Sequence, residues 1–254
     1  MDSPFLSIII PAYNEESRLP HTLAQVLDFI QNQPFDSEVL VVENGSRDRT
    51  LQIAQEFAAS HGRFRVIHET ERGKGRAVKR GMLAASGKFR FMCDADLSMP
   101  VGEITRFLPP RLVDYDVAIA SREAPGAVRY NEPAYRHLGG RLINWMIRLL
   151  ALPDLQDTQC GFKCLRDTVA MDLFDSLSLI GWSFDVEMLY LARLRGYRIV
   201  EVPIHWYFNS DSKINPLNDS MKMGLDILKM RWNARRGLYR KHPASIASHQ
   251  SRTR

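Results

Sequence analysis

The sequence has few cysteines and no long hydrophobic run, and each absence excludes a class of protein. Its 254 residues include three cysteines, Cys93, Cys160 and Cys164, which are too few for a disulfide framework and lack the spacing of zinc ligands. We therefore expect three reduced thiols. The longest apolar stretch, near residues 145–152, is interrupted by Arg148 and is far shorter than the roughly 20 residues that span a bilayer. The chain does not begin with a signal-peptide pattern, and we expect a cytoplasmic protein without a spanning helix.

The composition is that of a globular protein, with its positive charge gathered at one end. Hydrophobic residues make up 45% and charged residues 25% of the chain, which excludes collagen-like, low-complexity and fully disordered classes. Nine of the 34 Lys and Arg residues and one of the 29 acids lie within residues 222–254, giving that segment +8 and the rest of the chain −3. Because the body is net negative and aromatic residues do not interleave the basic ones, we expect no nucleic-acid partner.

Strand and helix patterns alternate over the first 120 residues. Five short β-branched or aromatic runs predict strands, at residues 6–11, 38–43, 64–68, 88–93 and 116–121. Apolar residues at helical spacing lie between the strands. This alternation predicts an α/β fold with a mostly parallel sheet that helices cover on both faces. Ligands of such sheets bind beyond the carboxyl ends of the strands.

The pattern changes after residue 121. Residues 122–133 are polar and predict a loop, and residues 197–206 are typical of strand material. Helices are predicted at 134–152, 184–195 and 218–239, the first and last of them amphipathic.

We predict a single domain over residues 1–240, because the sequence contains no internal repeat and no linker. Its first half covers about residues 5–121 and its second half about residues 122–240. Residues 241–254, rich in Ser, His and Arg, are expected to form a disordered basic tail. The sequence gives no prediction of the oligomeric state.

The strongest chemical signal is a pair of carboxylates directly after a predicted strand. Asp94 and Asp96 are two residues apart, so in extended chain they point the same way. Hard anionic oxygens of this kind suit Mg²⁺ or Mn²⁺ with phosphate as a co-ligand. By itself the Asp-x-Asp pattern is also typical of a solvated turn. Lys74, within the glycine-containing run 72–76 at the start of a predicted helix, favours a phosphate nearby.

Two further polar loops follow the first two predicted strands. The first contains Pro11-Ala12-Tyr13-Asn14-Glu15 and the second Glu43-Asn44-Gly45-Ser46. Either loop alone is compatible with an ordinary connection between a strand and a helix. Together they place hydrogen-bond acceptors for a base and a ribose at two neighbouring strand ends.

These motifs, in this order and spacing, resemble those of the family 2 inverting glycosyltransferases, which have the GT-A fold. The resemblance rests on residues 10–15, 43–46, 73–75 and 94–96. Three later runs are similar to the dolichyl-phosphate β-glucosyltransferase and polyprenyl-phosphate glycosyltransferase branch: residues 157–163 (Asp-Thr-Gln-Cys-Gly-Phe-Lys), 182–187 and 210–213. The resemblance covers about residues 5–232. It implies that the half of the domain at about residues 5–121 binds the nucleotide and that the half at about residues 122–240 binds the acceptor.

The resemblance implies roles for individual residues on the donor side. The expected nucleotide-sugar site consists of Pro11, Ala12, Tyr13, Glu15, Glu43, Asn44, Gly45, Ser46, Lys74, Asp94, Ala95, Asp96 and Lys213. Within it, Asp94 and Asp96 would hold Mg²⁺ or Mn²⁺ on the diphosphate, and Lys213 would reach the phosphates. Glu43 stands where the family more often has Asp, and it would accept a hydrogen bond from uracil N3–H.

On the acceptor side the prediction depends on the chemistry of the acceptor. A lipid phosphate is already anionic at pH 7 and needs cations, for which we assign Arg122, Arg129 and Arg136. A sugar hydroxyl needs a general base. Asp157 is our first candidate for a carboxylate near the acceptor and Asp185 is the second, and a capping role is the alternative for each. The residues predicted to be catalytic are Asp157, Asp96 and Lys213.

The expected activity is metal-dependent transfer of a hexose, glucose from UDP-glucose in the favoured case, to a polyprenyl or dolichyl phosphate. Transfer to a soluble or glycan hydroxyl, donation from GDP-mannose, and a nucleotide-sugar-binding protein without turnover stay open. The amphipathic segments 134–152 and 218–239 combine Trp, Leu and Met with Lys and Arg. That combination suits the surface of an anionic bilayer, so a peripheral membrane protein is expected. The alternative is that both segments pack on the sheet.

Overall fold

The structure is a computed structural model that describes residues 3–208 and 216–239, without the side chains of residues 134–139, 142 and 216–220. Its centre is a seven-stranded sheet in the order β3-β2-β1-β4-β7-β5-β8. All neighbouring strands run parallel except that β7 is antiparallel to both β4 and β5. The strands are β1 (Leu6–Ala12), β2 (Ser37–Glu43), β3 (Phe64–His68), β4 (Phe89–Met92), β5 (Val117–Ser121), β7 (Lys163–Arg166) and β8 (Ile199–Pro203).

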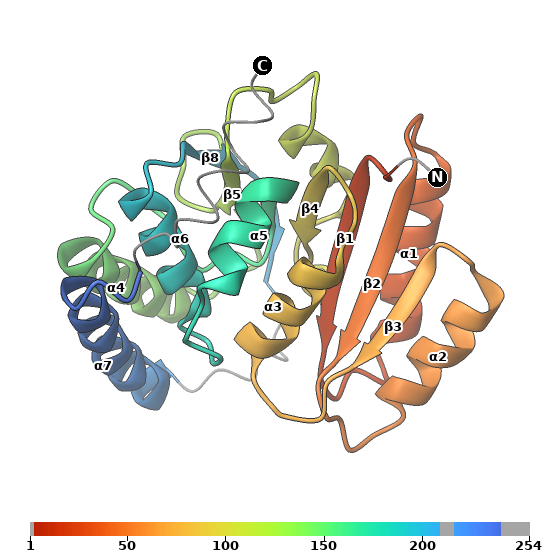
Figure 1. Ribbon diagram of the computed structural model, residues 1–254, viewed down its shortest axis with the longest axis horizontal. Coiled ribbons are helices and arrows are strands. Elements are labelled where there is room, and N and C mark those ends of the chain that lie inside the picture. The colour runs from red at the N-terminus through yellow and green to blue at the C-terminus, as the bar shows by residue number, and fades with distance from the viewer. Residues whose placement is uncertain (1–2, 209–215, 240–254) are drawn as a thin grey trace.

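Helices cover both faces of this sheet (Figure 1). Helices α1 and α2 lie on one face, and α3 and α5 lie on the other, while α4 and α7 pack against each other at the β8 side of the molecule. The helices are α1 (Leu19–Gln31), α2 (Thr50–Ser60), α3 (Lys74–Ala84), the 3₁₀ helix η1 (Val101–Phe107), α4 (Ala134–Leu150), α5 (Asp167–Asp175), α6 (Phe184–Leu194) and α7 (Pro216–Arg235).

The alternation of side chains along β1 builds two hydrophobic cores. Ile8 and Ile10 point into the core that contains Leu23 of α1, whereas Ile9 points into the core that contains Val78 of α3. All of these side chains are fully buried. A strand that is buried on both faces has a nearly continuous run of apolar, β-branched residues. This explains why polar and apolar residues do not alternate regularly around residues 6–10. The two cores hold the strand ends in a fixed arrangement.

The predicted α/β architecture, with its five N-terminal strands, is confirmed. The predicted helices at 184–195 and 218–239 correspond to α6 and α7. The prediction of loop throughout residues 122–133 is wrong at β6 (Val128–Tyr130), which pairs in parallel with β9 (His205–Tyr207) to form a second, two-stranded sheet. A three-residue strand whose partner lies some 75 residues later has no detectable local period.

The predictions for the cysteines, for membrane-spanning helices and for the C-terminal tail can be compared with the structure to different extents. Cys93, Cys160 and Cys164 are buried free thiols, as predicted. In the described ranges, no helix has both the length and the hydropathy that crossing a membrane requires. The predicted tail, residues 241–254, and the run 210–213 lie outside the described residues.

Candidate active site

Three polar loops meet at one edge of the sheet because their strands run parallel and in register. Ala12 lies opposite Glu43, so β1 and β2 end side by side. The neighbouring strand β4 ends at the same edge with Met92, which lies opposite Ile9 of β1. The Asn44 N–H donates to the carbonyl of Ala12 at 2.9 Å. The structure therefore brings together the loops after β1, β2 and β4 that the sequence predicted to form the donor site.

Hydrogen bonds join the first two loops into one rigid unit. Asn14 has a left-handed backbone with φ of 51°, and its N–H donates to Ser46 Oγ at 3.0 Å. In the other direction, the Arg47 N–H donates to Asn14 Oδ1 at 2.9 Å. The predicted donor residue Tyr13 adjoins this clamp, and the Arg72 guanidinium lies 5.0 Å from its ring centroid. The Glu15 carboxylate forms a bidentate pair with Arg18 at 2.7 and 2.9 Å.

Glu43 is completely buried and holds the second loop from within. One carboxylate oxygen accepts the Ser46 N–H, and the other pairs with His68 Nδ1. Burial favours the neutral acid, but the bonds from Ser46 and His68 outweigh it and lower the pKa of Glu43. Both oxygens are thus engaged inside the turn, and the contact of Glu43 with uracil stays a prediction.

Lys74 lies beside Asp94, the first carboxylate of the Asp-x-Asp pair. Its Nζ is 2.8 Å from Asp94 Oδ1 and 4.9 Å from the centroid of the Trp182 ring. Burial alone would lower the pKa of Lys74, but the charges of Asp94 and Asp185 outweigh it and raise that pKa. Lys74 therefore remains a cation at the point where the donor phosphates are predicted to bind.

Asp94 and Asp96 fit a divalent cation that takes most of its ligands from phosphate and water. Burial and the neighbouring charge of Asp94 raise the pKa of Asp96, and a cation between the two carboxylates would offset that repulsion. Asp96 Oδ1 accepts the Ser98 N–H at 3.0 Å, which orients it. Over the described part of the chain, no cluster of three or more His, Cys, Asp or Glu side chains forms a complete metal cage. Such partial sites are typical of Mg²⁺ on substrate phosphates.

Gly161 sets the position of Asp94 from the other side. A Cβ at Gly161 would lie 1.9 Å from Asp94 Oδ2, far inside van der Waals contact. The run 157–163 therefore reaches Asp94 as well as containing Asp157, which was predicted to lie near the acceptor. From the sequence, this run was a mark of the branch and the source of Asp157, and nothing in its spacing indicated the contact with Asp94.

Asp157 and Arg122 form an ion pair on the side of the site where the acceptor is predicted to bind. The Asp157 side chain is completely buried and accepts hydrogen bonds from Arg122 Nε at 2.7 Å, Nη2 at 2.9 Å and the backbone N–H at 3.0 Å. Burial would raise the pKa of Asp157, but Arg122 outweighs it and lowers that pKa. Glu201 accepts the Asp157 N–H at 3.0 Å and fixes its backbone.

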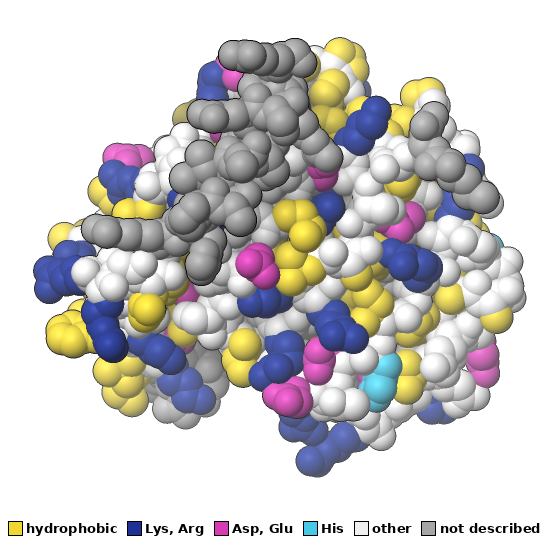
Figure 2. Space-filling model, viewed as in Figure 1, with side chains coloured by type: hydrophobic (Ala, Val, Ile, Leu, Met, Phe, Trp, Pro, Cys, Tyr) yellow, Lys and Arg dark blue, Asp and Glu magenta, His cyan; other side chains and the backbone are white. Residues whose placement is uncertain are grey.

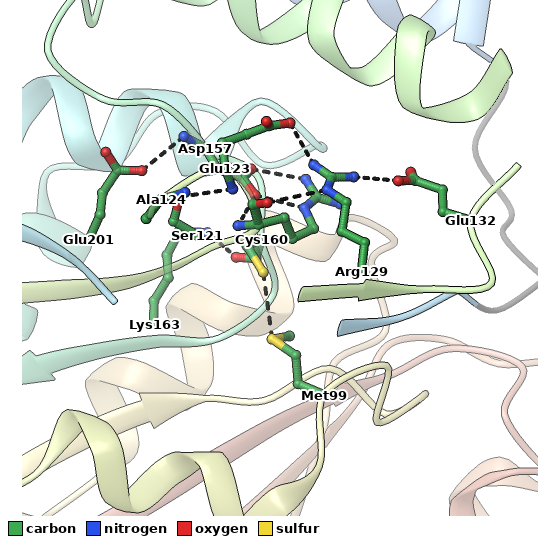
Figure 3. Close-up of polar contacts among 11 residues, drawn as sticks. Met99, Ser121, Glu123, Ala124, Arg129, Glu132, Asp157, Cys160, Lys163 and Glu201 are labelled. Carbon is green, nitrogen blue, oxygen red and sulfur yellow. Dashed lines mark hydrogen bonds and ion pairs between the residues drawn. The ribbon is translucent and has the colours of Figure 1, made fainter. Parts of the chain in front are cut away.

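Arg129 is held between two carboxylates (Figure 3). Its nitrogens lie 2.6 Å from Glu123 and 2.6 Å from Glu132. The guanidinium carbons of Arg122 and Arg129 are 5.4 and 5.9 Å from the Trp206 ring centroid, so one indole supports both cations. Trp206 was not among the residues predicted for the site. Of the other predicted residues, the side chain of Arg136 and all of Lys213 lie outside the described residues.

A buried lysine connects the two sides of the site. Lys163 is 1% exposed; its Nζ lies 2.8 Å from Asp185 Oδ1 and donates to the Cys160 carbonyl at 2.6 Å. Its charge also contributes to the lowered pKa of Asp157. Burial raises the pKa of Asp185 in spite of Lys163. Anions and cations thus alternate across the site in the order Asp94, Lys74, Asp185, Lys163, Asp157 and Arg122.

Comparison with known proteins gives a consistent picture of the chain's relatives. The model for glycosyl transferase family 2 matches residues 7–174. The dolichyl-phosphate beta-glucosyltransferase of Drosophila melanogaster is 36% identical over 248 residues, which cover 91% of this chain and 76% of that protein. The human dolichyl-phosphate beta-glucosyltransferase is 31% identical over 256 residues, covering 94% and 79%.

Solved structures share the fold at lower sequence identity. Glucosyl-3-phosphoglycerate synthase from Mycobacterium tuberculosis, crystallised with Mn²⁺ and uridine-diphosphate-glucose, superposes with a TM-score of 0.61 at 19% identity. The superposition covers 89% of this chain and 78% of that one. This likeness confirms the predicted GT-A type of architecture.

The buried pair of Asp157 and Arg122 predicts a specific pH dependence of stability. Because folding lowers the pKa of Asp157 below its usual 3.8, its contribution is fully present above about pH 5 and is lost as the pH falls through the folded value. Asp157→Asn should cost about 3 kcal/mol of unfolding free energy at pH 7. It should also flatten the loss of stability below pH 4, as measured by urea denaturation across pH.

The matched control is Asp154→Asn, which breaks an exposed pair with Arg193. We expect that change to cost less than about 1 kcal/mol. Equal costs for the two variants, or parallel pH curves for Asp157→Asn and the wild type, would contradict the assignment of a buried, stabilising ion pair.

Proposed function

The chain belongs to glycosyltransferase family 2 and is a glycosyltransferase, and from that premise we propose that it transfers glucose from UDP-glucose to a polyprenyl or dolichyl phosphate. The transfer inverts the anomeric centre and depends on a divalent cation. The names of the most similar relatives support the sugar and the acceptor. The neighbour crystallised with Mn²⁺ and UDP-glucose supports the donor and the metal.

The observation that carries this proposal is the pairing of the site carboxylates. Asp94 pairs with Lys74, Asp185 with Lys163, and Asp157 with Arg122. A hydroxyl acceptor needs a carboxylate that can take up its proton, and a buried carboxylate whose pKa is lowered by Arg122 is a poor base for that task. A phosphate acceptor is already ionised at pH 7. Cations bind it without a base, so the arrangement favours a phosphate.

On the donor side the residues bind the nucleotide and stabilise the leaving group. The clamped loops with Tyr13 and Asn44 flank the base and ribose. A divalent cation held by Asp94 and Asp96 would neutralise charge that develops on the diphosphate. Lys74 adds a fixed positive charge at the same place. A preorganised cation stabilises developing charge without the reorganisation that water would require.

On the acceptor side Arg122 binds the phosphate, and Asp157 is its positioning residue. The ion pair occupies Nε and Nη2 of Arg122, while Nη1 takes no part in it, and we assign this remaining nitrogen to the acceptor phosphate. A phosphate oxygen forms the new bond to the anomeric carbon. The bond from that carbon to the donor diphosphate breaks, UDP leaves with the electron pair, and no proton is transferred. Since a polyprenyl phosphate resides in a bilayer, the reaction takes place at a membrane surface.

The proposal predicts which mixtures give product. With UDP-glucose, Mn²⁺ or Mg²⁺ and a short polyprenyl phosphate, we expect a lipid-phosphate-linked β-glucose, identified by mass spectrometry and the anomeric NMR coupling. EDTA should abolish its formation, and GDP-mannose should replace UDP-glucose poorly. Metal-dependent UDP-glucose binding with no transfer to the lipid phosphate would contradict the acceptor, while preferential use of GDP-mannose would contradict the donor.

Gly161 provides a test of the donor carboxylates that does not remove any of them. Gly161→Ala adds a methyl group that must displace the Asp94 carboxylate. We expect UDP binding in the presence of Mn²⁺ to weaken about tenfold or more in calorimetry, equivalent to about 1.4 kcal/mol. Gly102→Ala is the control, since its added methyl group meets open space. Unchanged Mn²⁺–UDP affinity in Gly161→Ala would remove Asp94 from the donor site.

A further inference from the structure

Helix α7 carries two apolar stripes, and one of them has no protein partner among the described residues. Met223, Ile227 and Met230 are at most 4% exposed and pack into the core. The second stripe consists of Met221, Leu225, Leu228 and Trp232, which are 58–68% exposed. Their spacing of four, three and four residues places them on one face of the helix. An ordinary surface helix has a polar face at that place.

Helix α4 extends this apolar surface. Trp145 and Leu149, one helical turn apart, are 61% and 66% exposed, and α4 packs directly against α7. A groove with a volume of about 460 Å³ lies between the two helices. Its lining consists of Leu150, Leu228, Arg231, Trp232 and Arg235. We refer to Trp145, Leu149, Met221, Leu225, Leu228 and Trp232 together as the docking face.

Basic side chains surround the docking face. Figure 2 shows hydrophobic and basic side chains intermixed in the region where Figure 1 places α4 and α7. Within residues 221–239 the acid is Asp226, which accepts a hydrogen bond from Ser183 Oγ at 2.6 Å. The exposed basic residues of the two helices and the turn after α7 are Arg141, Arg148, Lys222, Lys229, Arg231, Arg235 and Arg236.

We propose that the docking face binds the surface of an anionic lipid bilayer. Exposed Trp, Leu and Met side chains would insert at the boundary between headgroups and acyl chains, and the surrounding Lys and Arg would contact anionic headgroups. The charge argues against other occupants. A second copy of the chain would bring two sets of cations together. The chain's own residues 240–254 would do the same, because they contain four Lys and Arg residues and no acid.

The docking face is linked to the predicted donor side of the site through Trp182 and Ser183, which directly precede α6. Ser183, the residue bonded to Asp226 of α7, directly follows Trp182, whose ring lies against Lys74. Bilayer contact by α7 would thus orient the donor site relative to the membrane. This consequence rests on the proposed function, because it matters only if the acceptor is a lipid. Bilayer binding itself requires neither donor nor acceptor.

The test is flotation of the full chain with vesicles that contain no polyprenyl phosphate. We expect binding to phosphatidylcholine–phosphatidylglycerol vesicles at low salt, and at least tenfold weaker binding to pure phosphatidylcholine vesicles or in 0.5 M NaCl. The double variant Leu225→Gln, Trp232→Gln should bind the anionic vesicles about tenfold or more weakly. Val113→Gln, which removes a side chain that is 55% exposed elsewhere, is the matched control and should bind like the wild type.

Three results would overturn the proposal: no binding of the wild type to anionic vesicles, full binding of the double variant, or a wild-type dimer in ultracentrifugation that the double variant loses. Circular dichroism of each variant verifies that it is folded. Since these vesicles hold no acceptor, failure of glucosyl transfer leaves this test unaffected. A negative flotation result leaves the transfer assay with a short, water-soluble polyprenyl phosphate equally unaffected.

Discussion

The structure depends on compensating the positive charge of one buried side chain, Lys163. Lys163 is almost completely inaccessible to solvent, and a charge buried in this way costs several kcal/mol unless it is paired. Asp185 supplies the pair, and because the Asp185 carboxylate is buried as well, Lys74 on its other side contributes to its compensation. Lys74 in turn forms an ion pair with Asp94, so the buried charges of the site compensate one another in series.

The same constraint shapes the chemistry that the site supports. On the other side of Lys163, Asp157 is bound to Arg122 and unavailable as a base. A site in which Asp94, Asp157 and Asp185 are paired with cations is suited to a donor and an acceptor that are both anionic. A nucleoside diphosphate donor and a phosphate acceptor meet that condition. Fixed cations at both ends stabilise charge as it moves from the acceptor to the leaving group.

Local sequence patterns predicted the parts of the site that one strand and its following loop contain. The loops after β1, β2 and β4 were predicted to meet because parallel strands end at a common edge. Gly161 and Lys163 were missed as parts of the donor side, because their contacts arise from β7 running antiparallel beside β4. A register between strands some 70 residues apart leaves no periodic signal. The pairing of Arg129 with both Glu123 and Glu132 was missed as well, since the sequence pattern does not show which of several nearby charges will pair.

The central claim is that the site acts on an acceptor that needs cations and no base. The most direct measurement compares glucosyl transfer to a polyprenyl phosphate and to the polyprenol of the same chain length, so that the head group alone differs. We predict that kcat/KM is at least a thousandfold higher for the polyprenyl phosphate than for the polyprenol, equivalent to about 4 kcal/mol. Comparable transfer to the alcohol would contradict it, because one of the paired carboxylates would then have to act as the base.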